Sequence, residues 1–247
     1  MPASDIPASH PRYRSLMARE LIVSGVERGV TSMHGLIAHG RGEAFDYLLG
    51  ETTHSFATDA VEAGCAALLT ASHPIISVNG NACALAATEL VQLAAACGAK
   101  LEVNIFHTSP QRELAIRTML EEAGAGEVLM PSKTHALEHI DHNRRWIHPE
   151  GIYLADVVCV PLEDGDRCQA LIKNGKRVVT IDLNPLSRTA RTATITIVDN
   201  LTRCLPLMIQ RAASLRDQPR YSLEQTVQAW DNAAALHSAE LAMRQSR

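Results

Sequence analysis

Residues 155–182 read ADVVCVPLEDGDRCQALIKNGKRVVTID, and the alternation within this stretch decides the fold. Its first part, 155–160, is apolar except for Asp156, which is typical of a β-strand buried on both faces. A helical segment follows at 165–174, and a β-rich run returns at 177–182. A strand, a helix and a second strand in this order predict a pair of parallel strands, because the helix returns the chain to the start of the next strand.

The same alternation extends to both sides of this unit. The remaining β-rich runs are at 75–78, 101–106, 128–130 and 194–198, and the helical runs between and after them are at 82–97, 110–123 and 200–215. The sequence therefore predicts an α/β fold with a Rossmann-like, doubly wound and mostly parallel sheet of about six strands. Such sheets bind ligands outside the carboxyl ends of their strands, so the loops after the strands are the place to look for chemistry.

Helical segments also flank this alternating core. They are predicted at 14–28, 42–49 and 57–71 before the first strand, and at 223–243 near the end of the chain. We expect the N-terminal helices, in about the first 70 residues, to pack on one edge of the sheet or to serve in oligomerisation. A chain of 247 residues suits one domain. Its parts are a mainly helical region at 1–72, an α/β core at 73–200 and C-terminal helices at 201–247.

Composition excludes several classes of protein. The net charge of -4 gives no electrostatic footprint for nucleic acid. The six cysteines form no CxxC pair and several sit in apolar runs, which favours buried, reduced thiols in a cytoplasmic protein. The N-terminus lacks the features of a secretory signal, and no apolar run approaches the ~18 residues needed to span a bilayer. We expect a cytoplasmic protein without nucleic-acid or membrane partners.

The first candidate for chemistry is GLIAHGRGEAFDY at 35–47, where two glycines flank Arg41 and a helix is predicted to start just after. Glycine lets the backbone approach a ligand closely, and a helix N-terminus favours anions. The planar fork of Arg41 suits a phosphate or a carboxylate. A surface arginine in a loop before a helix explains the same pattern equally well.

The second candidate is SVNGNA at 77–82, which lies between a strand and a helix. Its position at a strand's carboxyl end makes Asn79 and Asn81 part of a possible cradle for phosphate or carboxylate. It is neither a GxGxxG fingerprint nor a GxxxxGK[ST] loop. A tight turn that needs Gly and Asn for positive φ is the simpler explanation.

The third candidate is PLEDGDR at 161–167, again directly after a strand. Its carboxylates Glu163, Asp164 and Asp166 are costly to bring together unless they are solvated or paired with a cation. Magnesium on nucleotide phosphates needs only one or two carboxylates and waters. Capping of the following helix is the alternative, because a helix N-terminus also favours Asp and Glu.

Two further loops follow the last strands. Asp182 can accept hydrogen bonds from ribose hydroxyls, and Ser187 and Arg188 can hold phosphates. Asp199 and Asn200 lie between the final strand and a helix. The least regular stretch, 135–148, reads as a polar, solvated loop with four histidines, and we prefer that interpretation to a zinc site.

Together these loops resemble the signature blocks of the phosphopantothenate synthetase family, the archaeal-type 4-phosphopantoate–β-alanine ligases. The matching blocks are LIAHGRGEAFDYLLGE at 36–51, ISVNGN at 76–81, VPLEDGDR at 160–167, DLNPLSR at 182–188 and ITIVDN at 195–200. The opening HPRYRSL at 10–16 also matches, so the resemblance covers about residues 10–235 in the family's order. The stretch 135–148 departs from the family pattern, and no role is assigned to it.

The resemblance implies a homodimeric Rossmann-like enzyme that joins β-alanine to 4-phosphopantoate in coenzyme A biosynthesis. ATP would be cleaved to AMP and diphosphate through an acyl-adenylate, with Mg²⁺ as the metal. The ATP-binding residues that it implies are Arg19, Arg41, Asp182, Leu183, Asn184, Ser187, Arg188, Asp199 and Asn200.

The chemistry assigns roles to the remaining candidates. The backbone amides at Asn79 to Asn81 and around His39 to Gly42 suit a tetrahedral oxyanion, and Arg41 suits the charge on the phosphates. His39 is the candidate base for the attacking amine. Glu163, Asp164 and Asp166 are the candidate metal ligands.

Two alternatives stay open. The Ala- and Arg-rich, Lys-poor composition is unlike that of thermophilic archaeal members, which leaves open an acid and amine other than the family's usual pair. The chain would then be a ligase of the same chemistry in another archaeal-type cofactor pathway, such as that of tetrahydromethanopterin. The second alternative is a non-catalytic, nucleotide-binding regulatory module, but a sensor needs fewer than four anion-type loops.

Overall fold

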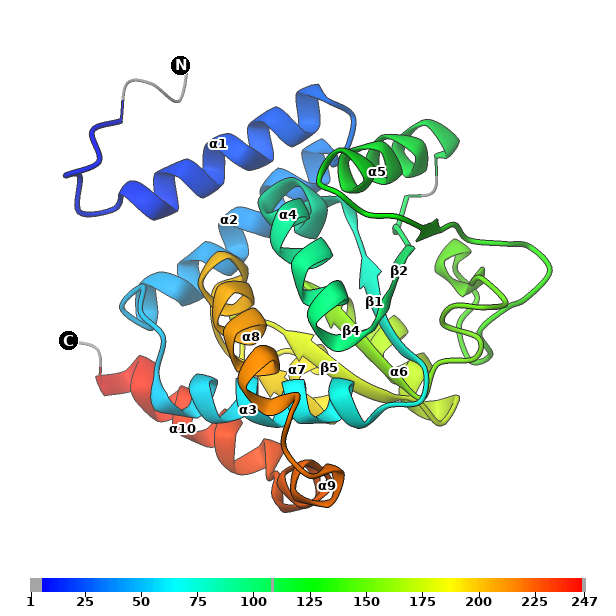
Figure 1. Cartoon of the computed structure of the whole chain (residues 1–247). Helices are drawn as coiled ribbons and strands as arrows, with labels where there is room; N and C mark the ends of the chain where they lie inside the picture. Colours follow the sequence, from blue (N-terminus) through cyan, green and yellow to red (C-terminus); the bar gives the residue numbers. More distant parts are fainter. Residues whose placement is uncertain (1–5, 108, 246–247) are drawn as a thin grey trace.

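The computed structural model describes residues 6–107 and 109–245, and its centre is a six-stranded sheet in which all paired strands are parallel (Figure 1). The strands are β1 Pro74–Val78, β2 Lys100–Val103, β3 Val128–Leu129, β4 Val157–Pro161, β5 Arg177–Ile181 and β6 Ile195–Ile197. Their order in the sheet is β3-β2-β1-β4-β5-β6. This is the order of the doubly wound nucleotide-binding fold, so the predicted fold class is confirmed.

Helices cover both faces of this sheet. They are α1 Tyr13–Glu27, α2 Met33–Leu48, α3 Ser55–Thr70, α4 Gly80–Cys97, α5 Pro110–Glu122, the 3₁₀-helix η2 Asn143–Arg145, α6 Gly165–Lys173, α7 Arg188–Thr192, α8 Leu201–Leu215, α9 Arg220–Ala229 and α10 Asn232–Gln245. Helices α3, α4, α5 and α8 pack on one face. Helix α6 and the connection between β3 and β4 pack on the other.

The central strand β4 shows why the sheet needs a layer on each side. Val157 and Cys159 face the core formed with α3, α4 and α8, whereas Val158 and Val160 face the core formed with α6. All five residues of the strand are buried. Full burial of a valine side chain contributes about 1.5–3 kcal/mol, so both faces stabilise the strand in this position.

The N-terminal helices pack on other helices and over a face of the sheet instead of along one edge, and their alternative role in oligomerisation stays a prediction. Helix α1 packs on α4, and α3 contacts β6, α8 and α9 as part of a layer over the sheet. Helix α2 begins at Met33, well before the predicted start at residue 42. The small residues of α3, among them Ala60, Gly64 and Ala67, let it lie close to the strands.

Two other expectations need correction. The predicted helix 223–243 is interrupted at Trp230 and Asp231, because the side chain of Asn232 accepts from Thr196 N at 2.7 Å and donates to Ala190 O at 3.0 Å.

Helix α4 is long and apolar enough to cross a membrane, contrary to the expectation that no such run exists. In this structure 56% of it is buried and it packs against α1, α5 and α8, as a core helix does.

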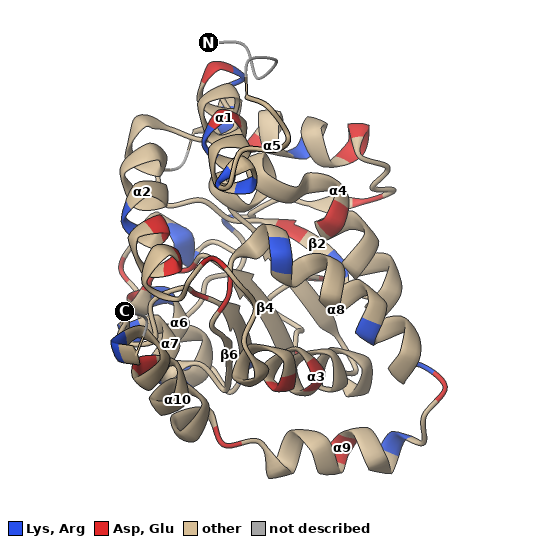
Figure 2. Cartoon of the chain, turned by 90° about the vertical axis from the view of Figure 1, so that its left-hand side faces the viewer, with Lys and Arg blue, Asp and Glu red and all other residues tan. Residues whose placement is uncertain are grey.

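Charged residues of both signs are interspersed over the side of the molecule shown in Figure 2. Many are paired, as in Arg211 with Glu62 at 2.7 Å and Arg220 with Glu224 at 2.9 Å. Basic and acidic residues are therefore mixed along the described elements that face the viewer in Figure 2.

Candidate active site

The sheet reverses its direction of growth between β1 and β4, and the loops after both strands leave it at the same edge. Ligands of open α/β sheets bind in the crevice at this point. A cavity of about 820 Å³ opens there, which is within the range of small-molecule sites. Helix α2, the loops after β1, β2, β4 and β5, and the start of α8 line it.

Most of the residues predicted from the sequence line this cavity, although their segments are far apart in the chain. They are His39, Arg41, Asn79, Asn81, Glu163, Asp164, Asp182, Leu183, Asn184, Ser187, Arg188 and Asn200. Arg19, Asp166 and Asp199 are not among its lining residues. The fold therefore brings the candidate loops to one place, as the strand-end rule predicts.

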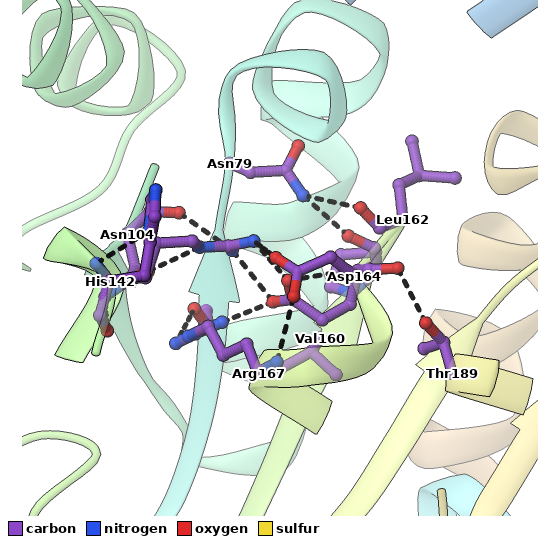
Figure 3. A network of polar contacts seen from close by, with 12 residues as sticks. Asn79, Asn104, His142, Val160, Leu162, Asp164, Arg167 and Thr189 are labelled. Atoms are coloured by element: carbon purple, nitrogen blue, oxygen red, sulfur yellow. Dashed lines mark hydrogen bonds and ion pairs between the residues drawn. The ribbon is translucent and has the colours of Figure 1, made fainter. Parts of the chain in front are cut away.

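Asn79 connects the ends of β1 and β4. Its Oδ1 accepts from Ala82 N at 3.0 Å and caps α4, while its Nδ2 donates to Pro161 O at 2.8 Å and Leu162 O at 3.1 Å (Figure 3). The side chain is therefore fully used in holding the crevice. What this loop can offer a ligand is the first-turn amides of α4, which have no acceptor within the helix and lie at its positive end.

Asn81 connects α4 to α2. Its Nδ2 donates to Gly35 O at 2.9 Å, and its Oδ1 accepts from the hydroxyl of Thr31. A Cβ at position 35 would overlap both the Asn81 and the Thr31 side chains, so only glycine allows this close approach. The Asn81 side chain is thus a contact between helices at the wall of the cavity.

The segment from His39 to Gly42 lies inside α2, so the prediction of a glycine loop before a helix was wrong. Its amides donate within the helix and cannot form a cradle for an oxyanion. The glycines suggested a loop, but the contacts of α2 with α1 and α4 outweigh their low helix propensity. Arg41 still lines the cavity, is exposed, and has no hydrogen bond or ion pair within the described residues 6–107 and 109–245.

His39 lies on the same helix with its ring partly buried at the cavity. Its Nε2 is buried and has no hydrogen-bond partner among the residues that the structure describes. Burial lowers the pKa of His39, although the carboxylate of Glu43 one turn later raises it. The ring is therefore neutral near pH 7 and can accept a proton, as the predicted base must.

The three predicted metal ligands are paired with arginines instead of being arranged around a common point. Glu163 forms ion pairs with Arg144 and Arg167, and Asp164 pairs with Arg144 (Figure 3). Asp166 lies outside the cavity lining and pairs with Arg188 at 2.6 Å. Within the described part of the chain, no group of three His, Cys, Asp or Glu side chains could hold a metal ion. The cation that offsets these carboxylates is guanidinium.

The centre of this network is buried. The side chains of Glu163 and Arg167 are 1% and 0% exposed. Arg167 also donates to Ser77 Oγ at 3.0 Å, so the network joins α6 to β1. Removing one partner of such a pair leaves an uncompensated buried charge, which typically costs about 3–5 kcal/mol.

Arg144 is a lining residue that sequence reasoning missed, because it lies in the stretch 135–148 to which no role was assigned. Its five N–H groups are all used: they donate to Asn104 Oδ1, to Asn104 O, twice to Glu163 and once to Asp164. Nothing in the local sequence indicates these contacts, because the partners lie in the loop after β2 and in the loop after β4. Arg144 therefore builds the wall of the cavity and has no donor left for a ligand.

The end of the cavity beside β5 is organised by Asp182. Its carboxylate accepts from Ser187 Oγ at 2.5 Å and from Asn184 N at 2.9 Å. Burial raises the pKa of Asp182, and these hydrogen bonds and the charge of Arg41 lower it. Ser187 also accepts from Ala190 N at 2.9 Å and caps α7, so the loop is held to the start of that helix.

Two residues assigned to ATP from the resemblance lie behind the cavity wall. Arg19 donates to the carboxylate of Glu43 at 2.9 Å, and Glu43 lines the cavity. Asp199 is buried and accepts from Arg203 at 2.6 Å and from the Thr53 hydroxyl at 2.6 Å. Arg19 thus contacts a residue that lines the cavity, and Asp199 does so by accepting from Asn200 N at 2.7 Å.

Asn200, next to Asp199, lines the cavity and caps α8. Its Oδ1 accepts from Thr202 N at 3.1 Å, and its Nδ2 donates to Asp46 Oδ2 at 2.9 Å. Asp46 is a buried residue of α2 and also pairs with Arg203 at 2.6 Å. Asn200 therefore fixes α2 relative to α8 beside the nucleotide candidates.

The opposite end of the cavity, beside β2, was also missed from the sequence. Arg112, His107 and His34 line it, and the rings of His34 and His107 are 5.0 Å apart. Arg112 donates to His107 O at 3.1 Å, whereas its Nε is buried without a partner within the described residues. Burial lowers the pKa of Arg112. A partly desolvated guanidinium with an unused donor favours an anion as its partner.

Comparison with known proteins agrees with this geometry. The sequence model of the phosphopantothenate/pantothenate synthetase family matches residues 56–246. The 4-phosphopantoate–β-alanine ligase of Methanosarcina mazei is 51% identical over 236 residues, which are 96% of this chain and 93% of that protein. The ligase of the same name from Thermococcus kodakarensis is 49% identical over 244 residues, 97% of this chain and 92% of that protein.

Proposed function

The chain belongs to the phosphopantothenate/pantothenate synthetase family, and from this premise we propose that it joins 4-phosphopantoate to β-alanine, with ATP cleaved to AMP and diphosphate. The product would be 4′-phosphopantothenate, an intermediate of coenzyme A biosynthesis. The enzyme is thus an acid–amino-acid ligase that works through an acyl-adenylate.

The observation that carries this proposal is that the cavity has a cation available at each end. Arg41 and Arg188 lie beside the β5 loop, and Arg112 lies beside the β2 loop. The reaction brings together two anionic substrates, ATP and a phosphorylated acid. We assign ATP to the β5 end and the phosphate of the acid to the β2 end, so that the acid's carboxylate faces the α-phosphate at the centre.

Adenylation solves a leaving-group problem. A carboxylate is a poor acyl donor, because the group displaced by an amine would be oxide. When the carboxylate oxygen attacks the α-phosphorus, diphosphate leaves and a mixed anhydride forms. The amine of β-alanine then attacks the acyl carbon, loses a proton, and displaces AMP.

The residues of the cavity fit these two steps. Arg41 and Arg188 lie where they can offset the charge on the departing diphosphate. The first-turn amides of α4, at Gly80 and Asn81, can stabilise the tetrahedral oxyanion. The neutral ring of His39 can take the proton from the amine, because its pKa is lowered by burial.

Magnesium was expected with ATP, but the carboxylates of the cavity do not fit a metal site held by the protein. Glu163 and Asp164 are paired with Arg144, and Asp182 is hydrogen-bonded to Ser187 and Asn184. Magnesium commonly keeps several waters and binds substrate phosphates, so it would arrive as part of the nucleotide.

Product analysis tests the proposed reaction. Purified enzyme is incubated with ATP, β-alanine and 4-phosphopantoate labelled with ¹⁸O in its carboxylate. An acyl-adenylate predicts that AMP forms and carries the label. Release of ADP with label in inorganic phosphate would overturn the mechanism, and AMP formation only with a different acid would overturn the substrate assignment.

We also propose that the enzyme is a cytoplasmic homodimer. All six cysteines are buried free thiols, which suits a reducing compartment. On α2, Met33, Ile37, Tyr47 and Leu48 are 45–73% exposed and share one side of the helix. Such a stripe suits a contact between two copies.

A further inference from the structure

The connection between β3 and β4 covers one side of the cavity's β2 end, although sequence reasoning assigned it nothing. Its residues 142–152, named here the 142–152 segment, include η2 and lie on the face of the sheet that α6 also covers (Figure 1). The segment supplies Arg144 to the cavity wall. How this irregular backbone is held is therefore relevant to the site.

Asn104, just beyond β2, holds the start of the segment. Its Nδ2 donates to Arg144 O at 3.2 Å and to Trp146 O at 3.2 Å, and its Oδ1 accepts from Arg144 Nε at 2.9 Å (Figure 3). Asn104 is 2% exposed. One buried side chain thus fixes both the backbone around Arg144 and its guanidinium.

Glu102 holds the end of the segment. It lies two residues before Asn104, so both side chains point to the same face of the strand. Its carboxylate accepts from His148 N at 2.9 Å and from Ile152 N at 2.6 Å. A Cβ at Gly151 would overlap the carboxylate, so the chain passes as closely as glycine allows.

Burying the Glu102 carboxyl group costs desolvation free energy, and packing of the core does not require a carboxyl group here. Glu102 is 0% exposed, and burial raises its pKa to about 7, although the two amides and Arg167 lower it. A hydrophobic residue in β2 would fill the core without this cost. What the carboxyl group adds is two hydrogen bonds from backbone amides, and these fix the 142–152 segment.

The segment also contacts the β2 end of the cavity directly. The ring of His142 stacks on Phe106 with centroids 4.0 Å apart, and Phe106 and His107 both line the cavity. Arg112 is in turn hydrogen-bonded to His107 O. A shift of the segment is therefore transmitted to the groups that we assign to the acid's phosphate.

The β5 end is held mainly by its own side chains. The side-chain hydrogen bonds of Asp182 and Ser187 stay within residues 182–190. Among the described residues, Arg144 forms no direct hydrogen bond or ion pair with residues 182–190. Glu163 joins the two, because its carboxylate pairs with Arg144 and its carbonyl oxygen accepts from Thr189 Oγ1 at 2.9 Å. Displacement of the segment should thus affect the acid, whose end it contacts directly, more than ATP.

We propose that Glu102 is a positioning residue of the ligase: by binding the His148 and Ile152 amides it holds the 142–152 segment, and with it Arg144 and His142, so that the β2 end of the cavity fits the phosphorylated acid. Glu102 touches neither substrate. The proposal rests on the proposed function only in placing the acid at that end.

The test compares Glu102→Gln with Asp156→Asn. Asp156 provides a matched control, because its carboxylate also accepts from two backbone amides, Ser72 N at 2.8 Å and His73 N at 2.8 Å, at the opposite end of the strands. For Glu102→Gln we expect KM for 4-phosphopantoate to rise by ~10-fold, with KM for ATP and kcat changed by less than ~3-fold. Asp156→Asn should leave both KM values unchanged, even if it lowers the melting temperature similarly.

Two measurements keep the result interpretable. Amide hydrogen exchange in the 142–152 segment should become faster in Glu102→Gln than in Asp156→Asn. Arg112→Gln, measured in parallel, tests the placement of the acid on its own. If Arg112→Gln raises KM for the acid and Glu102→Gln does not, the positioning role is wrong and the proposed function stands.

If Arg112→Gln leaves KM for the acid unchanged, the acid has been placed at the wrong end, whatever Glu102 does. Should Glu102→Gln fail to fold, Asn104→Ser provides the second variant, because it weakens the same segment at its other end. It should show the same rise in KM for the acid alone. Equal changes in KM for both substrates would overturn the proposal.

Discussion

At the scale of single residues, the cavity contains charges that are already paired and charges that can meet a ligand. Glu163, Arg144 and Arg167 neutralise one another and are buried, so they stabilise the wall. Arg41 has no ion pair within the described residues. Arg188 is paired with Asp166, but both side chains are more than half exposed, and such surface pairs exchange partners at little cost.

This difference predicts which arginines matter for ATP. Arg41→Ala or Arg188→Ala should weaken ATP binding or turnover by ~10- to 100-fold, from the ~1.5–3 kcal/mol of a charge-assisted hydrogen bond. The fold should survive, since neither side chain is buried. Calorimetric titration with ATP checks this, with Arg211→Ala as a control that loses only a surface pair with Glu62. Wild-type affinity in both site variants would refute the ATP assignment.

Glu102 also predicts a dependence of stability on pH. Its pKa is about 7 in the folded protein, above its ordinary value of 4.5, so the folded state binds a proton more tightly than the unfolded state does. Its contribution to the free energy of unfolding is therefore present below pH 4.5 and is lost as the pH rises through about 7. Urea titrations from pH 4.5 to 8 should show wild type losing stability relative to Glu102→Gln over this interval. A constant difference between the two proteins would contradict the raised pKa.

At the scale of elements, α2 has two different sides. One side packs closely on α4 through Gly35 and presents His39 and Arg41 to the cavity. The other side is open, and a Cβ at Gly40 would meet no atom within 4 Å. Glycine is therefore required at one position of the helix and merely tolerated at the other.

A pair of alanine substitutions in α2 tests this difference between Gly35 and Gly40. Gly40→Ala should raise the free energy of unfolding of the single chain by about 0.5–1 kcal/mol, because alanine has the higher helix propensity and its Cβ meets no atom of the chain within 4 Å. Gly35→Ala should lower it, because the new Cβ overlaps the Asn81 and Thr31 side chains. Denaturant titration of both variants gives the two signs. Stabilisation by both would mean that α2 does not approach α4 as closely as described.

At the scale of the whole molecule, the exposed stripe on α2 predicts a homodimer. Ile37 is 73% exposed in the isolated chain, so Ile37→Asp should place a charge in the contact and give a monomer near the chain mass of 26.8 kDa. Light scattering at micromolar protein measures this. Tyr221→Asp on α9 is the control, since Tyr221 is 66% exposed but far from α2 in sequence and lies outside the stripe. A wild-type protein that is already monomeric would refute the prediction.

The sequence by itself determined the sheet and the place of the site. Runs such as 155–160 must be buried on both faces, so they specify parallel strands covered by helices. The strand-end rule then placed the loops of Asn79, Glu163 and Asp182 along one edge, and they do line one cavity. These conclusions depend only on local patterns and on the geometry of a parallel sheet.

Only the tertiary structure decided where α2 begins and which cations meet which carboxylates. A glycine-rich helix is marginal alone, and it is the packing against α4 that makes residues 33–41 helical. The partners of Glu163 are Arg144 and Arg167, and Arg144 comes from a loop without regular periodicity. Ion pairing depends on distances across the fold, which spacing along the chain does not encode. The positions of Arg144, Arg112 and Glu102 at or near the cavity therefore follow only from the tertiary structure.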